Sequence, residues 1–197
     1  TATKGQNSND AMEGQLLALD GVSDAKIFVN IPGTDDYNSN LPDYVVWAIV
    51  EGGANSDIAN TIYQNSTGLP TYGNVSVDIE TVSGQTFNTK FDRANPVPLY
   101  IKFDYQSIVT PAISDTMPIK EEMVQNLVYS LGQDAETSII TDVARNAIAN
   151  NGNGGFALNV KISLDETNWT EYIQSTSVQN KFVVDTSRIS INVIAMS

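Results

Sequence analysis

The 197-residue chain contains no cysteine and no histidine. Without cysteine it has no disulfide framework, no thiolate metal site and no cysteine nucleophile. Without histidine it lacks the commonest general base, the commonest metal ligand and the side chain that titrates near neutral pH. Most enzyme mechanisms use one of these two residue types. We therefore expect a protein that is not an enzyme and that uses no cofactor, metal or small-molecule substrate.

Basic residues and long apolar runs are also scarce. The chain has 10 Lys and Arg against 23 Asp and Glu, a formal net charge of −13, which would repel a phosphate backbone. The longest strongly apolar stretch, residues 44–50, is far shorter than the roughly 20 residues that cross a bilayer. We therefore expect no nucleic-acid partner and no membrane insertion.

The length and the 41% hydrophobic content allow one domain or two small ones, and we favour two. The boundary is predicted at Asn95-Pro96-Val97-Pro98, since two prolines stiffen a connector and do not fit a central strand. The chain begins with Thr1 and a polar stretch to Asp10, and we expect it to be a piece of a longer polypeptide.

The first domain, residues 1–95, is predicted to be a small α+β sandwich. An apolar cluster at residues 16–19 indicates a short helix that ends at Gly21. The elements expected after it are strands over 25–31 and 44–50, a helix over 54–65 and a β-hairpin over 74–92. The sheet should carry the helix on one face.

The second domain, residues 96–197, is predicted to have a strand, two helices and three strands. Apolar residues alternate from Val97 to Tyr105, which is typical of a strand. Helical periodicity covers 119–131 and 135–150, and strands are expected near 156–164, 178–184 and 188–194. The fold class is therefore α+β, with two small domains, each a mostly antiparallel sheet with one or two helices packed on a face.

Three patterns resemble reactive or ligand-binding sites, but each has a simpler structural explanation. Gly52-Gly53 lies between a strand and a helix but lacks the spacing of a phosphate-binding loop, so we predict a tight turn. The acidic loop with Asp35, Asp36 and Asp43 lacks the spacing of a calcium loop and is expected to be solvated. Four acids could pair for glycoside hydrolysis, but we expect solvated sheet acids; they are Asp78, Glu80, Asp92 and Asp104.

The two tryptophans occupy different contexts. Trp47 lies in a continuous apolar strand, which predicts a core position. Trp169 lies in the polar stretch 165–172 and is the better candidate for a surface that meets a partner.

A series of motifs resembles the baseplate J-like (wedge) protein family of contractile-tailed phages and related particles, in its C-terminal part. The motifs, in chain order, are Val-Val-Trp-Ala-Ile-Val-Glu-Gly-Gly, ending at Gly53; Ser56-Asp57-Ile58-Ala59; Thr67-Gly68; Thr71-Tyr72-Gly73-Asn74; Ser83-Gly84-Gln85; Phe91-Asp92-Arg93; and the Pro-Val-Pro-Leu-Tyr-Ile strand. The resemblance begins near Asp10, is strongest through Tyr105 and weakens after Pro111. Family members usually carry a further N-terminal region.

The resemblance implies a virion protein of the tail baseplate, assembled in the bacterial cytoplasm, that joins neighbours into a ring. The implied partners are other baseplate and tail proteins, including copies of itself, and no catalytic residue is carried over. Only local roles transfer: Gly52 and Gly53 make the strand-to-helix turn, Ile58 and Ala59 seat the helix, and Gly68 and Gly73 shape the next two turns.

Two other functions remain open on the residues alone. A receptor- or carbohydrate-binding module of a tail or surface protein would also use a β-rich structure and exposed aromatics such as Trp169. A hydrolase with two carboxylates would need a deep cleft and an acid with a raised pKa.

Overall fold

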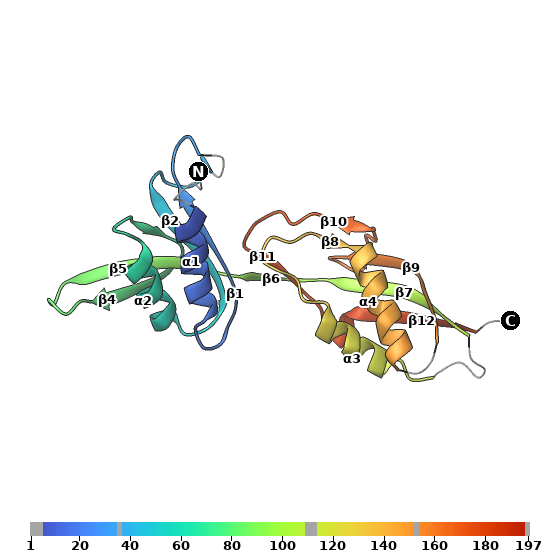
Figure 1. Ribbon diagram of the computed structural model, residues 1–197. Coiled ribbons are helices and arrows are strands. Elements are labelled where there is room, and N and C mark those ends of the chain that lie inside the picture. Colours follow the sequence, from blue (N-terminus) through green and yellow to red (C-terminus); the bar gives the residue numbers. More distant parts are fainter. Residues whose placement is uncertain (1–5, 35–36, 109–113, 152–153, 196–197) are drawn as a thin grey trace. The chain divides into compact units, whose positions relative to one another are not determined.

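The computed structural model describes residues 6–34, 37–108, 114–151 and 154–195. The fold is α+β, as the sequence predicts, and the chain divides into two compact units, Thr1–Ala94 and Asn95–Ser197 (Figure 1). The sequence predicts this boundary after residue 95, one residue later than in the structure. Each unit has its own hydrophobic core, and each is described by itself below.

The first unit is a mixed sheet with two helices on one face. Its elements are α1 (Gln6–Leu17), β1 (Val22–Asn30), β2 (Val45–Gly52), α2 (Asn55–Asn65), β3 (Thr71–Tyr72), β4 (Val75–Glu80) and β5 (Thr86–Arg93). The strand order is β1-β2-β5-β4, with β3 also paired to β2. The first six residues of β2 are all buried, which explains why this strand is apolar without alternation.

The core of the first unit lies between the sheet and the two helices. Met12 and Leu16 from α1 and Ile58, Ala59 and Ile62 from α2 pack on Val46, Ala48 and Val50 of β2. On the helix α2 these side chains recur at helical spacing, so one face is buried and the rest meets water.

The second unit combines a three-stranded sheet with two helices and two short strand pairs. Its elements are β6 (Asn95–Pro98), β7 (Tyr100–Ser107), α3 (Met117–Asn126), β8 (Ala135–Glu136), α4 (Thr137–Asn150), β9 (Gly155–Ser163), β10 (Tyr172–Ile173), β11 (Asn180–Val183), the 3-10 turn η1 (Thr186–Arg188) and β12 (Ile189–Ala195). The main sheet has the order β12-β7-β9, and the other pairs are β10-β8 and β11-β6.

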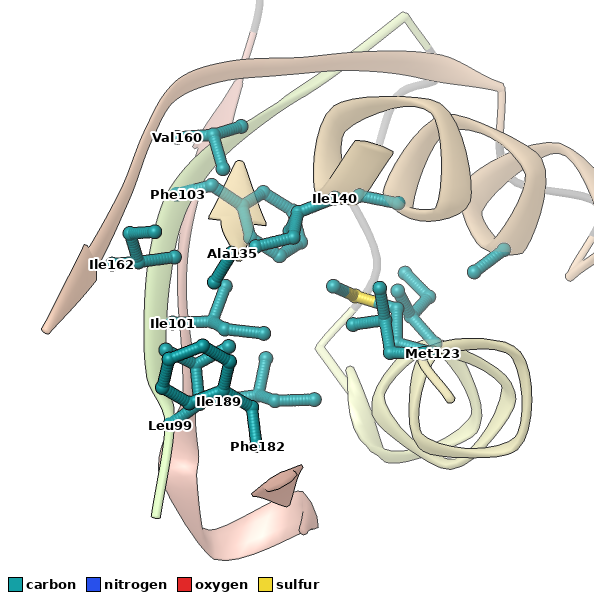
Figure 2. Packing of buried hydrophobic residues seen from close by; sticks show 14 of the residues in the cluster. Leu99, Ile101, Phe103, Met123, Ala135, Ile140, Val160, Ile162, Phe182 and Ile189 are labelled. Carbon is teal, nitrogen blue, oxygen red and sulfur yellow. The ribbon is translucent and has the colours of Figure 1, made fainter. Parts of the chain in front are cut away.

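The central strand β7 alternates between the core and the outer face of this sheet. Ile101, Phe103 and Tyr105 are buried, and Figure 2 shows Ile101 and Phe103 directed toward the helices that carry Met123 and Ile140. The residues between them, such as Lys102 and Asp104, lie on the opposite face. The helices therefore cover one face of the sheet, and the other face carries polar side chains together with the exposed apolar residues Phe156, Leu158 and Ile194.

The structure corrects the expected helix over 119–131, because α3 ends at Asn126. Leu127 leaves the helix with ψ near 73°, and the residues after it have no regular secondary structure before the turn at 131–132. Tyr129 and Leu131 are still buried, with the Tyr129 ring edge-on to Phe182 at 5.7 Å between centroids. Apolar spacing over one turn fits a helix or an extended segment equally well, so periodicity alone placed this end too late.

Three further boundaries also differ from the sequence-based prediction. The first helix, predicted at residues 16–19, covers Gln6–Leu17, so it begins within the polar stretch. The strand predicted from Val97 to Tyr105 is divided at Leu99, because β6 pairs with β11 while β7 pairs with β9 and β12. The second helix begins at Thr137, not 135, because Ala135 and Glu136 pair with β10. Both pairings connect segments far apart in sequence, which local patterns do not reveal.

No helix among the described residues is long and apolar enough to cross a membrane.

Candidate functional site

The residues of the Gly-Gly motif form a tight turn at the end of β2. Gly52 and Gly53 have φ of 74° and 70°, the left-handed region that glycine adopts without penalty. A Cβ at Gly52 would overlap the Gly21 carbonyl oxygen, and one at Gly53 would overlap the Val22 side chain. The turn therefore needs glycine at both positions, for conformation and for close approach of β1.

Arg93, at the end of β5, is bound to this turn. Its guanidinium donates to the carbonyl oxygens of Gly52 and Gly53, the latter at 2.9 Å, and to the Asn55 side chain at the start of α2. Partial burial lowers the pKa of Arg93. Because a cation binds the carbonyl oxygens here, Arg93 stabilises the fold of the turn itself.

A second group of motif residues gathers around the buried carboxylate of Asp92. Trp47 Nε1 donates to Asp92 Oδ2 at 2.8 Å, and the backbone and side-chain nitrogens of Asn74 both donate to Oδ1 at 2.8 Å. Asp92 is only 4% exposed, so the expectation of a solvated sheet acid is wrong for this residue. Three donors compensate its burial, which makes it a structural anion.

Aromatic rings and a glycine pack around Trp47 and Asp92. Trp47 is buried, as predicted, with the Phe28 ring 5.5 Å and the Tyr72 ring 6.3 Å from its own. Gly73 has φ of 148°, and a Cβ there would overlap the backbone of Phe91. We call the set Trp47, Gly52, Gly53, Gly73, Asn74, Asp92 and Arg93 the framework cluster.

The remaining motif residues have local structural positions. Ile58 and Ala59 are fully buried on α2 in the first core. Gly68 lies in the turn after α2 with φ of 82°, and a Cβ there would meet open space. Glycine is therefore favoured at position 68 by backbone conformation alone.

The acidic loop is organised by the asparagine that ends β1. Asn30 is buried, and its side-chain amide donates to the carbonyl oxygens of Asn38, Leu41 and Pro42. Asp43 accepts from the Tyr37 hydroxyl at 2.9 Å, which raises the pKa of Tyr37. Asp35 and Asp36 lie outside the described residues, and the rest of the described chain contains no group of three or more acidic side chains placed to hold a metal.

The other candidate acids are on outward-facing positions with amide partners. Asn88 donates to Asp78 at 2.7 Å on the β4-β5 hairpin, and Glu80 is exposed on the same strand. Asp104, in the second unit, accepts from Asn159 at 2.7 Å and from Asn192 at 2.8 Å. These bonds, that from Asn159 first, lower the pKa of Asp104, which is the opposite of what a catalytic acid requires.

Trp169 is half-buried at the border of the outer face of the second sheet. Its ring covers Lys102, whose ammonium lies 4.1 Å from the ring centroid, and its Nε1 donates to the Glu166 carbonyl at 3.0 Å. Asp165 holds the loop by accepting from Thr167 and Asn168, which keep the pKa of its carboxyl well below the usual range. Trp169 is therefore positioned by its own loop.

Beside Trp169 the outer face has an open hollow. It is lined by Lys102, Phe103, Asp104, Asn159, Lys161, Ser190 and Asn192. Lys161 forms an ion pair with Glu171 at 2.6 Å. In the hollow the side-chain amides of Asn159 and Asn192 lie close to Lys102 and Lys161. Only the strand pairing could reveal this arrangement.

No protein-family model and no curated protein matches the chain.

Proposed function

We propose that the chain is a structural subunit of a phage-type tail baseplate, which contacts neighbouring baseplate and tail proteins and copies of itself. The proposal rests on the resemblance described above. It places the protein in the virion, after assembly in the bacterial cytoplasm, with no catalytic role.

One observation supports this proposal more than any other. The residues that carry the resemblance, far apart in sequence, converge in the framework cluster, where each fixes backbone shape or donates or accepts a hydrogen bond with another member. Asp92 and Arg93, the charged members, have their hydrogen bonds directed at the protein itself. Motif residues with such roles suit a subunit that must present rigid surfaces to its neighbours.

The test is affinity capture of the full-length gene product from lysate of producing cells, with mass spectrometry of the bound proteins. We expect tail-hub and other baseplate proteins to be recovered. A parallel capture with a Gly52→Ala variant, in which the added Cβ overlaps the Gly21 carbonyl oxygen and distorts the turn, should recover less of them. Recovery of host surface receptors alone, equally with both variants, would contradict the proposal.

A second candidate function, carbohydrate binding, is favoured by the surroundings of Trp169. A half-exposed indole beside the carboxylate of Asp104 and the amides of Asn159 and Asn192 offers both stacking and polar contacts for a sugar ring. In this case the chain should be retained on polysaccharide columns. Trp169→Ala should abolish the retention and Trp169→Phe should keep part of it; equal elution of all three proteins would exclude this function.

A further inference from the structure

The C-terminal strand β12 forms an edge of the main sheet in the second unit. It pairs in parallel with β7 from Ile189↔Ile101 to Ala195↔Ser107, and β9 lies on the other side of β7 (Figure 1). Within the described ranges, no backbone hydrogen bond joins residues 190–195 to anything but β7. One row of backbone donors and acceptors is thus left to pair outward.

The other edge strands have features that discourage pairing with a foreign strand. β4 carries Asp78 and Glu80, and β1 carries two charges and a register shift at its start. β9 has a bulge near Asn159 and a bridge from Ile162 to Thr170. The sequence of β12, Ile-Ser-Ile-Asn-Val-Ile-Ala, contains no charge, proline or glycine, and its register is regular. Among described edges of four residues or more, only β12 has none of these protections.

The position of β12 is fixed by side chains on the outer face. Asn192 donates to Asp104 of β7, and Asp104 also accepts from Asn159 of β9, so one carboxylate connects all three strands. An edge held in this way is already in the geometry that an added strand requires, which reduces the entropy lost on pairing.

The side chains of β12 define the pattern of a complementary strand. Ile191 and Val193 point toward the core but are only half-buried, because the core ends beside them. Ser190, Asn192 and Ile194 are exposed on the outer face, so two of its three outward-facing side chains are polar. An added strand with apolar residues on the inner side and polar residues on the outer side would complete the burial of Ile191 and Val193.

Charge distinguishes the possible partners. The second unit, residues 95–197, carries 11 Asp and Glu against 6 Lys and Arg, so pairing two copies along β12 would bring like charges together, whereas β12 itself is uncharged. A strand with basic residues on both sides would be attracted by the same field.

We propose that β12 is a docking edge for an extended strand of a different protein, with alternating apolar and polar residues between basic flanks. The proposal goes beyond the baseplate function and does not depend on it, because it follows from the edge geometry and charge of the second unit.

The probe is a synthetic peptide of alternating valine and threonine between lysine-rich ends, added to the full chain. Amide hydrogen exchange across residues 189–195 should slow on binding, while exchange across β4 and β1 stays unchanged. The same peptide with every backbone amide N-methylated should give no protection, because it cannot donate to the edge. A peptide with glutamate ends should bind more weakly than the lysine peptide. The difference between the two affinities should shrink as the salt concentration is raised.

A matched pair of variants locates the contact. Val193→Lys puts a charge at the place where the partner's apolar side chain would pack, so peptide affinity should fall at least about tenfold. Val77→Lys changes an equally half-buried valine on the edge strand β4 and should leave affinity unchanged. If Val193→Lys fails to fold, hydrogen exchange on the original chain with the two peptides still decides.

Unchanged exchange across residues 189–195 in the presence of the lysine peptide would overturn the proposal, as would equal protection by the N-methylated peptide. Sedimentation of the chain alone tests whether β12 pairs with β12 of a second copy. If the chain dimerises and Val193→Lys returns it to a monomer, β12 pairs with itself and the proposed partner is wrong. Failure of the peptide test would leave the capture of baseplate proteins unaffected, so the two proposals are separable.

Discussion

At the scale of single residues, the framework cluster combines two kinds of constraint. The glycines are required by backbone conformation and by contacts too close for a side chain, whereas Asp92 and Arg93 hold segments together by hydrogen bonds. The two constraints predict different consequences of substitution, which unfolding experiments can separate.

Gly52→Ala and Gly68→Ala should differ strongly in their cost. Both positions have positive φ, so each alanine pays about 1–2 kcal/mol for the left-handed conformation. Gly52→Ala also forces a Cβ onto the Gly21 carbonyl and should lose at least about 3 kcal/mol in total, whereas a Cβ at Gly68 meets open space. Urea unfolding measures both. Equal losses would show that the close approach of Gly21 is unimportant.

Asp92→Asn should destabilise the first unit by about 1–3 kcal/mol, because the amide keeps only one of two acceptor oxygens in a buried site. The control is Asp78→Asn, which changes an exposed acid with a single amide partner and should cost less than about 0.5 kcal/mol. The free energies of unfolding from urea titration give the comparison. Similar values for the two variants would contradict a buried structural role for Asp92.

At the scale of elements, the sequence predicted most segments but not their partners. Alternation at Val75, Val77 and Ile79 and the glycine after α2 indicated a hairpin and a helix end correctly, because these signals are local. Arg93 binds a turn 40 residues away, and β12 pairs with a strand nearly 90 residues away, so neither contact leaves a local pattern. The segment 127–131, which is not helical, was wrongly predicted as helix because its apolar spacing continues that of α3.

The segment that follows α3 makes a prediction through Tyr129. Its hydroxyl is the one buried side-chain polar atom without a hydrogen-bond partner among the described residues, and burial raises its pKa to about 12. Tyr129→Phe removes the unpaired group and should stabilise the protein by about 1 kcal/mol. Thermal or urea unfolding at neutral pH checks this, with the exposed Tyr44→Phe as control. A clear loss of stability would mean that the hydroxyl has a partner.

The same tyrosine should contribute to alkaline unfolding. Its folded pKa of about 12 is above the ordinary value of 10.0, so the folded state holds the proton more tightly. The associated stability is complete below pH 10 and is lost as the pH rises from 10 to 12. Tyr129→Phe should therefore show a smaller decline over this range, measured by urea unfolding at each pH. An identical decline would contradict the burial of the phenol.

At the scale of the whole molecule, two units with separate cores should fold separately. Residues 1–94 and 95–197, expressed as two fragments, should each show a cooperative thermal transition and the far-ultraviolet circular dichroism of a folded α+β unit. A fragment that is unfolded alone but structured when mixed with the other would contradict the independence of the cores.

The central claim, a structural place in a tail baseplate, is tested most directly by immunogold electron microscopy of particles purified from producing cells. Antibodies against the full chain should label the distal end of the tail, and mass spectrometry of the same particles should detect the protein. Purified tails that carry neither label nor protein, with the chain found instead on the cell surface, would contradict the account.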